Sequence, residues 1–182
     1  MNVSTSLLVI LMFTSIVGIG IANILMAFAE HISTLSKVRG RSLGAAWLLI
    51  ILLSYLGMFW NSTLIVERED WLYTEFLFVV LGPILLLFSS SLMIRLLARD
   101  PENESDDVSD HTLPRFFLIY ACVQGWFIGM DYILFDMWSV ATTLSFALLI
   151  AAACLAFVKK QSVVWGFTAV ILTLSIIDIV LR

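Results

Sequence analysis

Two polar side chains stand inside an apolar run that is long enough to cross a membrane. The run extends from Arg115 to Asp136, reads RFFLIYACVQGWFIGMDYILFD, and contains Gln124 and Asp131. On a helix, Tyr120 lies one turn before Gln124 and Asp131 lies two turns after it, so the three side chains form one polar stripe. An ionisable group in a membrane span is costly and usually faces protein or water. The stripe therefore predicts a pathway or binding site for a cation.

Other acids are expected at the same end of the protein. Glu75 and Asp178 each lie near the end of a predicted helix, at a depth similar to that of Asp131. The acids expected on this side are Glu67, Glu69, Asp70, Glu75, Asp131, Asp136 and Asp178. Converging carboxylates attract cations or share a proton, which predicts an acidic outer mouth. The structural alternative is that they reach the interface or accept hydrogen bonds from neighbours.

A third polar group, Asn23, lies inside the first apolar run. An amide at that depth can line a pathway, or it can form hydrogen bonds between helices, which is the structural alternative.

Small residues recur at helical spacing in two of the runs. Ala121, Gly125 and Gly129 form a small-xxx-small-xxx-small face beside the polar stripe, and Gly18 and Ala22 form a shorter one in the first run. Small residues allow the backbones of membrane helices to approach closely. Both faces are predicted to pack against another helix, either within the chain or from a partner.

The composition indicates a membrane protein. Apolar residues make up 61% of the 182 residues, charged residues 13%, and the mean hydropathy is +1.03. A soluble chain of this size needs more polar surface than this. The net charge of −4 argues against nucleic acid as a partner.

We expect a single all-α membrane domain over 1–182 with six transmembrane helices, because charged residues cluster between apolar runs of about 20 residues, enough to cross the hydrocarbon core. The predicted spans are 6–29, 43–61, 71–97, 115–135, 137–158 and 163–181. Residues 100–113 read as an acidic cytoplasmic loop; its alternating acids resemble a calcium loop but lack the glycine and the final glutamate. Pro83 should kink the third span, and Ser89, Ser90 or Ser91 could supply a partner for the freed carbonyl.

The basic residues predict the orientation. With both termini outside, the cytoplasmic segments hold Lys37, Arg39, Arg41, Arg95, Arg99, Arg115, Lys159 and Lys160. Only Arg68 and Arg182 lie on the outer side. The positive-inside rule therefore places the N- and C-termini outside.

Several segments resemble a family of small bacterial inner-membrane proteins with six helices. These segments are GIGIANILMAFAEHI, GMFWN, WLYTEFLFVVLGPILLLFSSSLMI and RFFLIYACVQGWF. The resemblance implies the helical membrane fold and a multi-pass location in the bacterial inner membrane. It implies no activity, since none is established for that family.

No catalytic motif is present in the sequence, so we do not expect an enzyme. His31 and His111 lack metal-ligand spacing, and Cys122 and Cys154 have no CxxC pattern. We expect neither a metal site nor a cofactor. The favoured interpretation is a small cation channel or carrier, in contact with lipid and forming a homo-oligomer. The alternative is a non-conducting subunit or sensor that packs against a membrane partner through Ala121, Gly125 and Gly129.

Overall fold

The regular secondary structure in the described part of the chain is entirely helical. The computed structural model describes residues 5–31, 39–67, 71–98, 106–134, 140–158 and 160–181. The helices are α1 (Thr5–His31), α2 (Arg39–Glu67), α3 (Tyr73–Leu97), α4 (Asp106–Gly129), α5 (Val140–Leu155) and α6 (Gln161–Leu181), and a π-helical turn, η2 (Met130–Leu134), continues α4. The predicted all-α class is confirmed.

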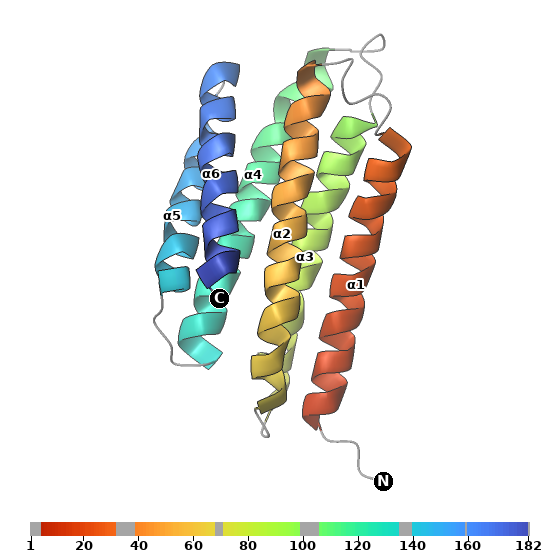
Figure 1. Cartoon of the computed structure of the whole chain (residues 1–182), viewed down its shortest axis with the longest axis vertical. Coiled ribbons are helices and arrows are strands. Elements are labelled where there is room, and N and C mark those ends of the chain that lie inside the picture. Colours follow the sequence, from red (N-terminus) through yellow and green to blue (C-terminus); the bar gives the residue numbers. More distant parts are fainter. Residues whose placement is uncertain are drawn as a thin grey trace.

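The helices run alternately up and down in one bundle (Figure 1). α1, α2 and α3 pack against one another, and α4 packs on α3. α5 lies along α4, and α6 completes the bundle by contacting both α5 and α2. α2 is therefore the helix that joins the first three helices to the last one.

Among the residues that the structure describes, four helices are long and apolar enough to cross a membrane: Thr5–Glu30, Ser42–Thr63, Tyr73–Leu97 and Thr112–Tyr132. The two remaining apolar helices are shorter, at Val140–Leu155 and Gln161–Ile177. Large apolar side chains such as Leu8, Met26, Phe88 and Ile176 are exposed on the outside of the bundle. An exposed apolar surface of this kind is typical of a protein that contacts lipid.

The helix that carries the polar stripe begins earlier than expected. We predicted a loop at 100–113 and a span from 115, but α4 is helical from Asp106. The acidic residues 106, 107 and 110 lie in the first turns of this helix, where the macrodipole favours negative charge. Pro114 lies inside α4, between this polar extension and the apolar run. Residues 99–105 lie outside the described part of the chain.

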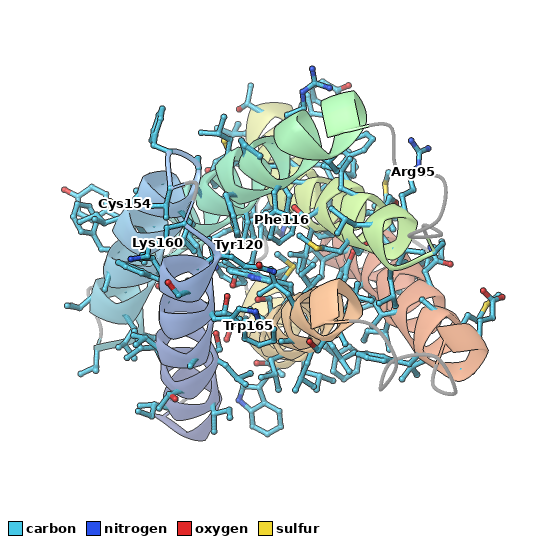
Figure 2. All side chains as sticks on the ribbon, turned by 90° about the horizontal axis from the view of Figure 1, so that it is seen from above. Arg95, Phe116, Tyr120, Cys154, Lys160 and Trp165 are labelled. Atoms are coloured by element: carbon cyan, nitrogen blue, oxygen red, sulfur yellow. The ribbon has the colours of Figure 1, made fainter. Side chains whose placement is uncertain are left out.

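An aromatic cluster joins α2 to α4 in the core. Trp47 is fully buried and meets Phe116, Phe117 and Tyr120 edge to face, with ring centroids 5.0 to 5.3 Å apart. Its indole nitrogen donates to Thr168 Oγ1 on α6 at 3.1 Å. A buried indole N–H needs an acceptor, so this bond fixes α6 against α2. Figure 2 shows Phe116, Tyr120 and Trp165 within this crowded middle of the bundle.

The serines of α3 do not bond the carbonyl that Pro83 leaves free, which is that of Val79. Ser89 donates to Leu85 O, while Ser90 and Ser91 both donate to Leu87 O, so these hydroxyls bond their own helix beyond the proline. Trp126 of α4 donates to the adjacent carbonyl, Phe78 O, at 2.6 Å. Short hydroxyls reach the carbonyl of the preceding turn most easily, whereas the long indole reaches across to another helix.

Gly82 makes this contact possible. The indole of Trp126 lies directly on Gly82, in the space that a Cβ atom would need. The rings of Phe78 and Trp126 are also close, with centroids 6.3 Å apart. The chain at Gly82 can therefore carry no side chain without moving α4.

We expect Gly82→Ala to destabilise the protein by about 1 to 3 kcal/mol, the usual cost of overpacking a rigid core. The added methyl group meets the indole of Trp126, which is itself held by its hydrogen bond. Thermal unfolding of the purified protein in detergent measures the effect. Gly166→Ala is the matched control, because a Cβ at Gly166 meets nothing within 4 Å; equal melting temperatures for the two variants would contradict the prediction.

Candidate functional site

The centre of the candidate site is a hydrogen bond between α5 and the π-helical turn. Thr142 Oγ1 donates to Asp131 Oδ2 at 2.9 Å. Thr142 is fully buried and Asp131 is half-buried. The carboxylate is therefore held among protein neighbours, with part of its surface still accessible.

Two features of the backbone favour a polar site at this point. Asp131 lies in η2, and π-helical turns within α-helices occur frequently at functional sites. Thr142 lies in the first turn of α5, and the N-terminus of a helix favours a nearby negative charge. The fold therefore presents both a hydroxyl donor and a favourable helix end to the carboxylate.

The rest of the polar stripe is buried. Tyr120 is 0% exposed and Gln124 is 3% exposed, while Leu118 and Cys122 on the same helix are exposed. The Tyr120 hydroxyl lies 3.4 Å from Ser54 Oγ on α2, within hydrogen-bonding distance. Tyr120 and Gln124 therefore face the interior of the bundle, and Asp131 continues the stripe into η2.

Glu75 has a structural partner. Its Oε2 accepts a hydrogen bond from the backbone N–H of Leu72 at 3.0 Å, so the carboxylate caps the start of α3. Glutamate at this position of a helix commonly bonds back to the residue before the helix. The structural alternative accounts for Glu75, and we do not place it with Asp131 in the candidate site.

The remaining acids of the predicted outer mouth are not described by the structure. Asp178 belongs to α6, but its side chain lies outside the described residues, as does that of Glu67. Glu69, Asp70 and Asp136 also lie outside them. Only Asp131 and Glu75 of the seven predicted acids can therefore be examined at the level of side chains.

Asn23 does not join the stripe. It lies on the exposed side of α1, together with Gly18 and Ala22. A Cβ built on Gly18 meets nothing within 4 Å. The face of α1 that packs into the bundle carries Phe13, Val17 and Ile24 instead.

The face formed by Ala121, Gly125 and Gly129 packs against helices of the same chain. A Cβ at Gly125 would lie 3.5 Å from Leu149 Cδ1 on α5, and one at Gly129 would lie 2.7 Å from Phe78 Cζ on α3. Ala121, on the same face, is half-buried. The glycines let α4 approach α3 and α5 closely, which is the intramolecular form of the predicted packing.

Sequence reasoning missed the residues on which the candidate site depends. Thr142 belonged to a row of hydroxyls in the fifth span, and nothing in its spacing distinguished it from Thr143 or Ser145. Trp126 and Phe78 read as ordinary apolar residues of their spans. The one available signal was the indole N–H of Trp126, a donor within an apolar run that had to find an acceptor.

Metal binding gains no support at this site. Among the residues that the structure describes, no group of three or more His, Cys, Asp or Glu side chains could hold a metal ion. What the arrangement can do chemically is offer a carboxylate and a hydroxyl to a cation or a proton.

Comparisons with known protein families, curated proteins and solved structures found no match to this chain. The resemblance to small bacterial inner-membrane proteins stays a prediction.

We expect Thr142→Val to destabilise the protein by about 1 kcal/mol, because it removes a donor to a carboxylate in a protein interior. The effect should be much smaller in a chain that already carries Asp131→Ala, since that substitution removes the acceptor and the two side chains form one interaction. Thermal unfolding of the four proteins of this double-mutant cycle measures the coupling. Thr173→Val is the control, because the Thr173 hydroxyl is exposed and bonds Ala169 O of its own helix; additive effects of the two substitutions at 131 and 142 would show that the bond contributes nothing.

Proposed function

We propose that the protein is an integral membrane protein with six spans and both termini outside. The alternating helix directions (Figure 1) are consistent with this topology, and Arg95, in the last turn of α3, and Lys160, just before α6, are both exposed. Figure 2 views the bundle from above and shows both side chains. Excess basic residues at one end are typical of the cytoplasmic side, which in a bacterium is the inner face of the inner membrane.

The two short helices fit this topology if the bilayer adapts. α5 has 16 residues, which corresponds to about 24 Å of helix, less than the roughly 30 Å of an average hydrocarbon core. Short spans are accommodated by local thinning of the bilayer or by flanking side chains that reach the interface. Under this topology the Asp131–Thr142 pair lies in the outer part of the membrane.

The function that this geometry supports best is cation transport, by a channel or a carrier. The observation that carries it is the half-buried Asp131 carboxylate, held in a π-helical turn by Thr142. An ionisable side chain inside a membrane segment is costly, and such side chains commonly mark ion or proton pathways. Gln124 extends the polar surface from this carboxylate toward the middle of the bundle.

A pathway through one copy of the chain is obstructed above this level. Trp47, Phe116, Phe117 and Tyr120 are each at most 1% exposed and fill the space between α2 and α4. A cation that reaches the half-buried Asp131 therefore needs another route across the membrane, and the boundary between associated copies can provide one. We accordingly propose that the transporting form is a homo-oligomer.

In liposomes that contain the purified protein, we expect cation uptake above that of empty liposomes, and a loss of most of it in Asp131→Asn. Neutralising the carboxylate removes the charge that attracts the cation but keeps the size and the acceptor for Thr142. Fluorescent reporters for K⁺, Na⁺ and H⁺ inside the liposomes measure the flux. Thr173→Val, on the exposed side of α6, should behave as the unmodified protein; an unchanged flux in Asp131→Asn would refute the proposal.

A second candidate function is that of a non-conducting subunit, and the exposed side of α1 favours it. The face of Ala121, Gly125 and Gly129 is already packed inside the chain, so a partner helix would have to bind elsewhere. Gly18 and Ala22 are exposed and permit close approach, and Asn23 carries an amide that hydrocarbon cannot satisfy. These residues make α1 the side on which a membrane partner would pack.

This candidate predicts that association depends on α1. Gly18→Leu combined with Ala22→Leu should separate the protein from its membrane partner, or from a second copy, because the larger side chains keep the backbones apart. Size-exclusion chromatography with light scattering measures the mass of the protein extracted in mild detergent. Gly166→Leu, on the exposed side of α6, is the control, and an unchanged mass in the α1 variant would exclude this face.

A further inference from the structure

Phe78 contacts α4 at the residue where that helix changes its winding. Its ring lies on Gly129, the last α-helical residue, and a Cβ on Gly129 would be 2.7 Å from Phe78 Cζ. An added Cβ would force either the ring or the helix to shift, so the present fit of the two depends on glycine at position 129. The π-helical turn begins at the next residue, Met130.

The same residue is held through its backbone. Trp126 donates its indole N–H to Phe78 O at 2.6 Å and lies on Gly82, one turn further along α3. α3 therefore contacts α4 at two positions, Trp126 and Gly129, which lie three residues apart on adjoining turns. A helix fixed at two neighbouring points cannot rotate about its axis at that place.

Asp131 follows the second of these points by two residues. A π-helix turns less per residue than an α-helix, so the residue at which the winding changes determines the direction of each later side chain. The Asp131 carboxylate must point toward α5 to reach Thr142. The place at which α4 is fixed therefore decides whether the hydrogen bond can form.

We infer that Phe78 is a positioning residue for the candidate site: its ring on Gly129 fixes the turn at which α4 widens, and so directs Asp131 to Thr142. Phe78 itself does not touch the pair in this account; it acts through Gly129. The functional meaning of the inference rests on the cation-transport proposal, but the geometric claim can be tested without any transport measurement.

The test compares two cysteine pairs along the α4–α5 interface. One pair is Asp131→Cys with Thr142→Cys, and the control pair is Gly125→Cys with Leu149→Cys, whose positions are also in contact. Cys122 and Cys154 are exposed and free, and are first replaced by alanine. Each pair is treated in liposomes with a short bis-thiosulfonate reagent, and the rate of intramolecular cross-linking is measured by mass spectrometry.

Phe78→Ala should slow cross-linking of the 131–142 pair about tenfold, equivalent to roughly 1.4 kcal/mol of lost coupling, and leave the 125–149 pair unchanged. If Phe78→Ala slows the cross-linking of both pairs, the whole α4–α5 interface has been disrupted. If it slows neither pair, η2 forms without Phe78. Both results overturn the inference.

A change of side-chain size provides a second readout. Gly129→Ala alone should also slow the 131–142 reaction, because the methyl group displaces α4 from the ring. In a chain that already carries Phe78→Ala, the same substitution should cause no further slowing, since the ring that the methyl group would meet is gone. A further slowing by Gly129→Ala in that chain, with the control pair intact, would show that Phe78 and Gly129 do not act as one contact.

The flux measurement keeps the two proposals separate. If Asp131→Asn leaves flux unchanged while the cross-linking results are as expected, the transport proposal fails and the positioning role of Phe78 stands. If Phe78→Ala leaves the rate of 131–142 cross-linking unchanged while Asp131→Asn abolishes flux, the inference fails and the transport proposal stands.

Discussion

Aromatic rings seated on glycines hold this bundle together. Inside a bilayer, lipid chains are as apolar as leucine, so burial of apolar surface cannot drive helices together and close packing must do so. Tyr55 of α2 lies on Gly20 of α1, in the space of the missing side chain. The pair of α3 and α4 uses the same device twice and in both directions, since each helix offers a ring to a glycine of the other.

Polar side chains in the bundle form two kinds of hydrogen bond, one within a helix and one between helices. Most hydroxyls, such as those of Thr14, Ser91 and Thr173, bond the carbonyl of the preceding turn in their own helix. Such bonds satisfy the hydroxyl but hold no helices together. In the described part of the chain, bonds between helices involve a long or charged side chain, as in Trp47 to Thr168, Trp126 to Phe78 and Thr142 to Asp131.

The sequence predicted the helical class and the approximate position of each helix, because hydrophobic runs bounded by charges are a strong signal. It also indicated a polar stripe on the fourth helix, and the side chains of Tyr120 and Gln124 are indeed buried. Boundaries were less predictable. An acidic stretch has the composition of a loop, yet the same acids stabilise the start of a helix, and only the structure decides between these effects at Asp106.

Pairing between helices was beyond the sequence for a physical reason. Several serines and threonines have the same spacing and the same chemistry, and which of them meets Asp131 depends on the rotation of two helices. The small residues illustrate the same limit. Periodicity identified Gly18, Gly125 and Gly129 as packing residues, but it contains no information on whether the neighbour belongs to the chain. Gly129 and Gly125 meet the chain itself, and Gly18 meets none of its described residues.

The early start of α4 has a mechanical consequence. Residues 106–113 continue the helix beyond the apolar run. The acidic residues of this segment therefore belong to a helix and not to a flexible loop. Pro114 lies between this segment and the apolar run, and proline weakens a helix at its position. A force on this segment would be transmitted along α4 to η2, which carries Asp131. The acidic segment and the Asp131 carboxylate therefore belong to the two ends of one continuous helical element.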